Sequence, residues 1–263
     1  MNMAEKTLNL HVRGAYDAIN VWEADIIYLY TDFRSFGTYY DTFENKHEFL
    51  VAFIDPLLQR GITIVVPTFT YTTSGEFHVE TTSSKLGALN TWILKQPNVQ
   101  RSEHPLFSYA AHGSLASFVL NVGKSAFGND CIFERLMVRK SAFLHIGRPV
   151  SMGNTCVHYV EHQCGATYRI HRAFKTRVFR GKECVGTDYS AFVRRLDVLG
   201  HDFFVDFDEG AKLLYKNKMI REVGDSDKFT NFSFYWCTPT IDFLMDAFNK
   251  DQKIFISENF LQY

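Results

Sequence analysis

The chain has 263 residues, with 28 Lys or Arg against 29 Asp or Glu, so its formal net charge at pH 7 is −1. This balance disfavours a nucleic-acid-binding protein, which would carry a basic field. No stretch approaches the ~20 apolar residues that cross a bilayer, and the first residues lack a signal-peptide pattern, so we expect a soluble, cytoplasmic protein without membrane or nucleic-acid partners.

Helices and strands alternate in the first part of the chain. Residues 12–20 and 43–59 have the apolar spacing of helices, and the apolar runs 25–30 and 62–66 are typical of buried strands. Strand, helix and strand in succession predict a crossover between parallel strands, whose carboxyl ends usually carry the ligand site. The loops after these strands, at residues 31–37 and 67–77, are therefore candidate ligand loops.

Further along, residues 85–96 and 114–122 predict helices, and residues 142–146 predict a third buried strand. A helix that Asn154 or Thr155 would cap follows. From residue 168 on, aromatic and basic residues alternate, which indicates antiparallel strands with a turn at Gly181, and residues 240–256 predict a helix and a short strand.

These elements predict one α/β domain over residues 1–263. We expect a central mixed, largely parallel sheet flanked by helices, with additional antiparallel strands in the C-terminal third. The core would span about residues 15–180, with the strands and helix of residues 168–263 packed on it.

The helix after Thr155 carries a candidate catalytic pair, His158 and Glu161, three residues apart on one face. A histidine that titrates near neutral pH can deprotonate an amine, and a carboxylate beside it would fix its tautomer and stabilise the imidazolium. Thr155, one turn earlier, could donate its hydroxyl to an oxyanion. By spacing alone, however, such a pair is more often a surface hydrogen bond, and Thr155 is equally suited to cap the helix.

Residues 101–113 form a loop dense in small and polar residues, in which Pro105 fixes the backbone and Ser108 permits close approach. Such a loop suits a phosphopantetheine arm or a diphosphate. By itself it is better explained as an ordinary ordered loop with His104 and His112 on its surface. The sequence lacks the GxxxxGK[ST] and GxGxxG motifs of nucleotide hydrolysis and dinucleotide binding.

Cysteine and histidine spacing gives little sign of a metal or a disulfide framework. Five cysteines without a Cys-x-x-Cys pair predict reduced thiols. His158, His162 and Cys164 are the nearest approach to a zinc site, but nothing completes the set, so we expect no metal. Acyl transfer through a thiolate at Cys156 or Cys164 would need a lowered thiol pKa and is disfavoured.

Taken in order, these segments resemble the aminoglycoside 3-N-acetyltransferase family. VWEADIIYLYTDFRSFG is similar to the family's first strand with its His-Ser-Ser-Leu type loop, and GITIVVPTFTY follows. Residues 101–113 match R-S-x-H-P-x-x-S-x-x-A-x-G, and residues 154–161 match N-T-x-x-H-x-x-E. The resemblance covers about residues 15–180. Two departures are Tyr30, where the family usually has His, and Asp32, where it has the second Ser.

The resemblance implies a fold distinct from that of GNAT acetyltransferases, acetyl-CoA as cosubstrate, and direct transfer to a sugar amine without an acyl-enzyme. It implies His158 as base, Glu161 as its orienting partner and Thr155 as the hydroxyl near the thioester carbonyl. It places Tyr71 and Asn154 on the substrate side. Residues along the CoA path would be Thr31, Asp32, Phe33, Arg34, Thr70, Ser102, His104 and Ser108.

The acceptor follows less directly, because aminoglycosides are polycations and the net charge gives no sign of an acidic cleft. Basic residues cluster instead after the catalytic helix, at Arg169, His171, Arg172, Lys175, Arg177, Arg180 and Lys182. Facing the cleft, they would favour an anionic acceptor such as a nucleotide-linked amino sugar of surface-polysaccharide synthesis. Facing solvent, they would protect a sheet edge.

We therefore predict an acetyl-CoA-dependent N-acetyltransferase that acts on a nucleotide-linked amino sugar. The alternative is an aminoglycoside 3-N-acetyltransferase that confers antibiotic resistance. A non-catalytic protein that binds CoA or a sugar is a second alternative, which the intact N-T-x-x-H-x-x-E set disfavours. The sequence does not decide which amine is acylated, the length of the acyl chain, or whether the protein is a monomer or a homodimer.

Overall fold

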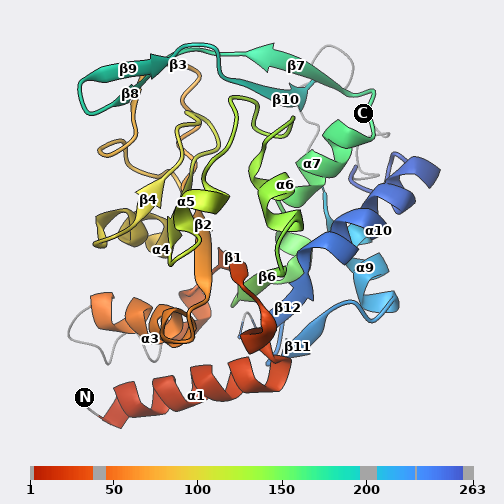
Figure 1. Cartoon of the computed structure of the whole chain (residues 1–263). Helices are drawn as coiled ribbons and strands as arrows, with labels where there is room; N and C mark the ends of the chain where they lie inside the picture. The colour runs from red at the N-terminus through yellow and green to blue at the C-terminus, as the bar shows by residue number, and fades with distance from the viewer. Residues whose placement is uncertain (1–2, 38–45, 196–205, 229, 257–263) are drawn as a thin grey trace.

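A seven-stranded sheet forms the centre of the computed structural model, which describes residues 3–37, 46–195, 206–228 and 230–256. The strand order is β11-β12-β6-β1-β2-β5-β4 (Figure 1). The strands are β1 (Ile26–Thr31), β2 (Thr63–Pro67), β4 (Gln100–Arg101), β5 (Tyr109–His112), β6 (Ser141–Ile146), β11 (Arg221–Val223) and β12 (Phe232–Trp236).

Parallel pairing is confined to the three central strands. β1 runs parallel to both β2 and β6, whereas β5 and β12 run antiparallel to the strands they border. This arrangement confirms the predicted α/β class with a mixed sheet. The apolar runs of the sequence correspond to β1, β2 and β6. β4 and β11 are too short to leave a periodic signal, and Ser233 interrupts the aromatic run of β12.

Helices cover both faces of the sheet. Ile27 and Leu29 of β1 pack in one hydrophobic cluster with α1 and α3, whereas Ile26, Tyr28 and Tyr30 pack in another with α6, α7 and α10. Alternate residues of β1 thus face opposite layers, as the pleat of a strand requires. Because both faces are buried, the parallel strands appear in the sequence as continuous apolar runs.

The helices are α1 (Met3–Ile19), α3 (Lys46–Gln59), α4 (Ala88–Trp92), α5 (Ala116–Val119), α6 (Ile132–Met137), α7 (Cys156–Gln163), α9 (Asp208–Lys216) and α10 (Cys237–Lys250). Short 3-10 turns span Val21–Glu23, Arg34–Phe36, Ile93–Lys95 and Val150–Met152. No described helix combines the length and apolarity needed to span a membrane.

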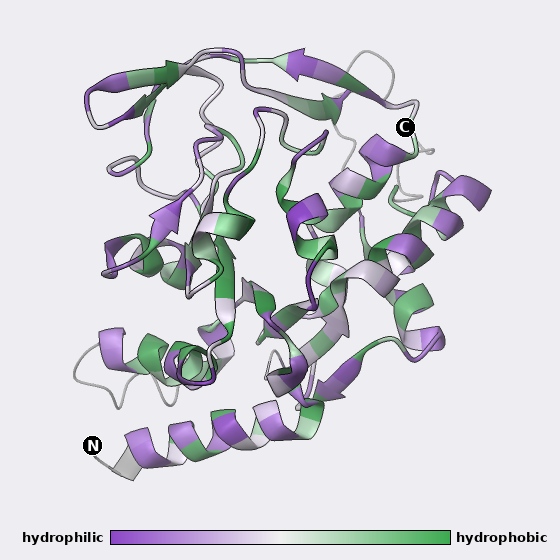
Figure 2. Ribbon diagram, viewed as in Figure 1, coloured by the Kyte–Doolittle hydropathy of each residue, from purple (hydrophilic) through white to green (hydrophobic). Residues whose placement is uncertain are grey.

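The helix predicted over residues 12–20 is part of the longer α1. Figure 2 shows hydrophilic and hydrophobic residues in turn along α1, whose buried side chains include Leu8, Val12, Ala15 and Ile19. This spacing places them on one face, which packs on the sheet layer. The helices predicted over 85–96 and 114–122 form only in part, as α4 and α5, and residues 43–45 of another prediction lie outside the described residues.

Two smaller sheets lie above the carboxyl ends of the central strands (Figure 1). Their strands are β3 (Ser74–His78), β7 (Arg169–Ala173), β8 (Lys175–Arg180), β9 (Glu183–Gly186) and β10 (Ser190–Arg194). β7 pairs antiparallel with β10 and β8 with β9, which confirms the antiparallel strands predicted there. Gly181 makes the predicted turn with a φ of +57°. In place of the short strand predicted after α10, residues 252–255 form a turn and Ile256 makes a single β-bridge.

Candidate active site

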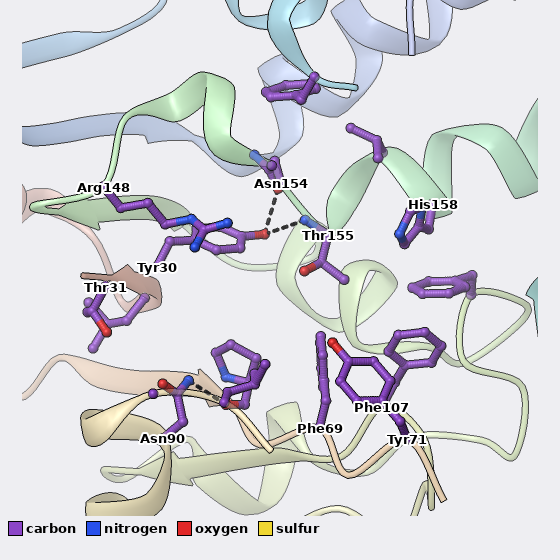
Figure 3. Close-up of a pocket in the computed structure, with 18 of the residues that line it drawn as sticks. Tyr30, Thr31, Phe69, Tyr71, Asn90, Phe107, Arg148, Asn154, Thr155 and His158 are labelled. Carbon is purple, nitrogen blue, oxygen red and sulfur yellow. Dashed lines mark hydrogen bonds between the residues drawn. The ribbon is translucent and has the colours of Figure 1, made fainter. Parts of the chain in front are cut away.

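A cavity of about 590 Å³ opens where the three parallel strands end (Figure 3). Tyr30 and Thr31 reach it from the end of β1, Pro67 from the end of β2, and Arg148 from the loop after β6. α7 and β10 close the opposite side. The cavity therefore lies where an α/β sheet usually carries its ligand.

α7 carries the candidate catalytic pair into this cavity. The Oδ1 atom of Asn154 accepts the N–H of Cys156 at 3.1 Å, so Asn154 caps the helix, while Thr155 makes no capping bond through its side chain. One turn later, the Nδ1 atom of His158 lies 2.9 Å from the Oε2 atom of Glu161. Figure 3 shows the His158 ring pointing from α7 towards the cavity. This pair is not a surface contact.

Glu161 is completely buried and is held by three donors. The Tyr168 hydroxyl donates to its Oε1 atom at 2.8 Å, and Nη2 of Arg169 lies 2.8 Å from Oε2, beside the bond from His158. Arg169 is itself fixed by donating to the Phe192 carbonyl at 3.1 Å. Although burial raises the pKa of Glu161, His158 and Arg169 outweigh it and hold that pKa below its usual value. The carboxylate is therefore ionised.

An ionised Glu161 selects the tautomer of His158. Nη2 of Arg169 lies 3.1 Å from Nδ1 but only 2.8 Å from the carboxylate, to which it donates. Because the carboxylate can only accept, Nδ1 carries the proton and donates it to Glu161, which leaves the lone pair of Nε2 for a group in the cavity. Burial, followed by the charge of Arg169, lowers the pKa of His158, and Glu161 only partly opposes this. His158 is consequently neutral at physiological pH and can accept a proton from a nucleophile.

Thr155 lines the cavity one turn before His158. Its backbone N–H donates to the Tyr30 hydroxyl at 3.0 Å, as drawn in Figure 3. The N–H is thus occupied, so any hydrogen bond from Thr155 to a ligand oxygen would come from the side-chain hydroxyl.

Four aromatic side chains form a wall of the cavity near His158: Phe69, Tyr71, Phe107 and Phe127. The sequence analysis named only Tyr71 among them as a site residue. Phe69 and Phe107 meet edge to face at 5.0 Å, Phe107 contacts Phe127 at 5.0 Å, and Phe127 lies 5.3 Å from the His158 ring. Such a wall suits the apolar part of a pantetheine arm or the face of a sugar. Among 25 Phe, no local signal distinguishes these three.

Of the four residues that the resemblance places on the first loop, only Thr31 lines the cavity. Nε of Arg34 donates to the Oδ1 atom of Asp32 at 2.9 Å, and this hydrogen bond keeps the pKa of Asp32 below its usual value. Phe33 packs on Phe53, with ring centroids 4.8 Å apart.

Four polar side chains of the matched pattern at residues 101–113 are buried: Arg101, Ser102, His104 and Ser108. Arg101 is buried and donates to Oγ of Ser108 at 3.1 Å and to the carbonyl of Thr68 at 2.9 Å. Oγ of Ser102 accepts the N–H of Tyr109 at 2.9 Å. These bonds close the loop upon itself, and neither serine lines the cavity.

His104 belongs to the same internal network, so its expected surface position is wrong. Its Nδ1 accepts the N–H groups of Leu106 at 3.2 Å and Phe107 at 3.1 Å, and Nε2–H donates to the Ser190 carbonyl at 3.0 Å. Burial lowers the pKa of His104 to about 4. Thr70 donates to the carbonyl of Pro105. This network presents Phe107 to the cavity.

The basic segment contributes one residue, Arg169, to the described lining. On β8, Arg177 pairs with Glu76 of β3 at 2.5 Å, and Arg180 pairs with Glu103 of the loop after β4 at 3.0 Å. Three of the described lining residues are nevertheless arginines, Arg148, Arg169 and Arg194, and none is Asp or Glu.

Neither of the two candidate cysteines, Cys156 and Cys164, is an activated nucleophile. Burial raises the pKa of Cys156 well above that of a free thiol and also raises the pKa of Cys164, and neither residue lines the cavity. Across the described ranges, no group of three or more His, Cys, Asp or Glu side chains is placed to hold a metal ion.

Comparison with known proteins identifies relatives. The sequence profile of the aminoglycoside 3-N-acetyltransferase family matches residues 31–232. The apoenzyme of AAC(3)-IVa superposes with a TM-score of 0.71 at 19% identity, over 94% of this chain and 90% of that one. YokD from Bacillus subtilis superposes with a TM-score of 0.71 at 18% identity, over 92% of this chain and 99% of that one. Sisomicin-bound AAC-VIa superposes with a TM-score of 0.75 at 15% identity, over 95% of this chain and 99% of that one. The search of curated protein sequences finds no match.

Proposed function

The chain belongs to the aminoglycoside 3-N-acetyltransferase family and is an acyl-CoA-dependent N-acyltransferase, and we propose that it transfers an acetyl group from acetyl-CoA to a primary amine of an amino sugar. The observation that carries the proposal is the set of contacts around Glu161. Its buried carboxylate holds Nδ1 of His158 at 2.9 Å and leaves Nε2 towards the cavity.

In the proposed reaction, the nitrogen of the acceptor amine attacks the thioester carbonyl while Nε2 of His158 removes a proton from that nitrogen. The electron pair of the carbonyl moves onto its oxygen, which the Thr155 hydroxyl stabilises. Collapse of this intermediate breaks the C–S bond, and the departing CoA thiolate takes the proton from the imidazolium. The negative charge of Glu161 stabilises the imidazolium between the two proton transfers. Because Cys156 is buried and outside the cavity lining, direct transfer is favoured over an acyl-enzyme.

The comparisons favour an aminoglycoside as the acceptor. A variant of AAC(3)-IVa has been solved with apramycin, and AAC-VIa with sisomicin. The comparisons give no support to a nucleotide-linked amino sugar as the acceptor. On this account aminoglycoside acetylation, and with it antibiotic resistance, is our first candidate.

A nucleotide-linked amino sugar is the second candidate, because one observation favours it. The described lining contains three arginines and no carboxylate. Arg169 is neutralised by Glu161, but Arg148 remains as a positive charge near the end of β1. A polycationic acceptor would be repelled there, whereas a phosphate would be attracted.

A thiol-release assay with acetyl-CoA tests both candidates. Apramycin, sisomicin and gentamicin would be compared with a panel of nucleotide-linked amino sugars at equal concentration. Saturable turnover with either class supports the general proposal, and the active class identifies the acceptor. Absence of turnover with both panels would favour the non-catalytic binding protein.

The variant Arg148→Gln separates the two acceptors further. We expect it to raise KM for a phosphate-bearing acceptor while leaving KM for an aminoglycoside unchanged or lower. The KM for acetyl-CoA is the control, since a rise there would assign Arg148 to the phosphates of the cosubstrate instead.

A further inference from the structure

A buried row of polar side chains continues from the active site into the core. Tyr30 lies on β1, His145 on β6 and Tyr235 on β12, while Asn154 precedes α7. The strand register pairs Tyr30 directly with His145, and their rings lie 4.6 Å apart. All four side chains are buried. Three adjacent strands and the start of α7 therefore meet in one hydrogen-bonded row, the Tyr30 relay.

Two backbone donors fix the direction of the hydrogen bonds that Tyr30 and Asn154 make. The Tyr30 hydroxyl accepts the N–H of Thr155 at 3.0 Å, so its own proton goes to Oδ1 of Asn154 at 2.5 Å. The N–H of Cys156 also donates to that Oδ1, at 3.1 Å, and this prevents the amide from turning over. Only one arrangement of Tyr30 and Asn154 satisfies both donors.

At the far end of the Tyr30 relay, Tyr235 and His145 continue the chain of hydrogen bonds. Nδ2 of Asn154 donates to the Tyr235 hydroxyl at 2.5 Å, and this hydroxyl lies 2.8 Å from Nε2 of His145. A neutral His145 can accept the one proton of the Tyr235 hydroxyl at Nε2. Burial, followed by the charge of Arg148, lowers the pKa of His145 to about 3, which agrees with this assignment.

We infer that Tyr30 is a positioning residue of the acyl transfer, acting through Thr155. Its hydroxyl holds the backbone N–H of Thr155, and thereby sets where the Thr155 side chain and the first turn of α7 lie over the thioester. The inference rests on the proposed function, in which the Thr155 hydroxyl stabilises the oxyanion. Oxyanion stabilisation depends on donor position to a fraction of an ångström, so loss of one fixed contact lowers the rate more than it weakens binding.

The position of Tyr30 separates this role from simple packing. Tyr30 lines the cavity together with Thr155, so loss of its hydroxyl changes a contact of the site itself. The cost of losing the hydroxyl should therefore appear in geometry at the site more than in overall stability.

The test compares Tyr30→Phe with Tyr16→Phe in the full chain. Tyr16 is an equally buried tyrosine whose hydroxyl donates to the Phe53 carbonyl at 2.8 Å in the other hydrophobic cluster. Tyr30→Phe is expected to lower kcat about 10-fold or more with KM for acetyl-CoA unchanged. Tyr16→Phe removes the same atom and is expected to leave kcat unchanged while lowering Tm by a similar or larger amount.

A double-mutant cycle with Thr155→Ala shows whether Tyr30 acts through Thr155. Once the Thr155 hydroxyl is gone, Tyr30→Phe is expected to lower kcat by less than 2-fold further. Equal losses of kcat in both Thr155 backgrounds, or an unchanged kcat in Tyr30→Phe, would overturn the inference. Absence of turnover in the wild type and in Tyr16→Phe would instead overturn the proposed function, and the inference with it.

Discussion

Replacing Glu161 with Gln tests the mechanism most sharply, because it removes a charge and almost no volume. The carboxylate accepts hydrogen bonds from three donors, on His158, Tyr168 and Arg169. An amide offers one oxygen and one NH₂ group, so one of the donors must face another donor. Arg169 cannot act as an acceptor, whereas the Tyr168 hydroxyl can, and His158 can if its proton moves from Nδ1 to Nε2. When the NH₂ group faces Tyr168, the variant loses only the negative charge that stabilises the imidazolium; when it faces His158, the proton shift also blocks the nitrogen that faces the cavity.

The size of the effect follows from two terms. The wrong histidine tautomer lowers kcat by up to about 10⁴ where a triad carboxylate is replaced by its amide, so we expect a fall of about 10²–10⁴ in Glu161→Gln. In addition, Arg169, whose side chain is only 4% exposed, loses its buried counter-charge. An uncompensated buried charge costs about 3–5 kcal/mol of stability.

The assay is kcat for acetyl transfer between about pH 5.5 and 9, with urea unfolding of the same samples. A general base must be neutral, so turnover of the wild type should rise with pH through the His158 pKa, which burial and Arg169 hold below 6.5. In Glu161→Gln the partner that raises this pKa is lost, so the rise should move to lower pH and reach a lower plateau.

Two further variants separate chemistry from folding. The double variant Glu161→Gln with Arg169→Met is expected to recover stability but not turnover. Tyr168→Phe keeps the charge of Glu161 and removes one donor, so it should lower kcat only a few-fold. If folded Glu161→Gln retained kcat within about 3-fold of the wild type, the assignment of Glu161 as the orienting partner would be wrong.

Three other predictions follow from the contacts. His158→Ala should lower kcat by about 10² or more, with affinity for CoA unchanged in titration calorimetry; near-normal turnover would remove His158 from the mechanism. His104 and His145 have pKa values of about 4 and about 3 in the native state against about 6.5 when unfolded. The unfolded state therefore binds more protons than the native state below pH 6.5, so the free energy of unfolding should be about 4 kcal/mol lower at pH 5 than at pH 8. An equal free energy of unfolding at both pH values would contradict the burial of His104 and His145. Gly113→Ala should destabilise the protein by about 2 kcal/mol or more in urea, because Gly113 has a φ of +131° and an added Cβ would lie 2.7 Å from Cα of Thr63.

Local patterns were sufficient for much of the fold and for the centre of the site. The three parallel strands are apolar runs because both sheet faces are buried, and this signal is contained within each strand. His158 and Glu161 are likewise a local feature, since one helical turn brings them onto the same face. The succession of strand, helix and strand predicted a ligand site at the carboxyl ends of the strands, and the cavity opens there.

Tertiary structure alone decided what surrounds that centre. Arg169 reaches Glu161 only because β7 pairs with β10, and Tyr30 reaches Thr155 across 125 positions of the chain. Asn154 rather than Thr155 caps α7, since its Oδ1 also accepts the Tyr30 hydroxyl.

The pattern at residues 101–113 shows the same division between sequence and structure. The sequence is sufficient to recognise it as ordered and rich in hydrogen-bonding groups, but not to say what those groups bind. In the folded chain Arg101 and His104 satisfy carbonyl and N–H groups of neighbouring loops instead of facing the cavity. Spacing along a chain determines which side chains share a face, whereas the partner of each polar group depends on which distant backbone segment packs against it.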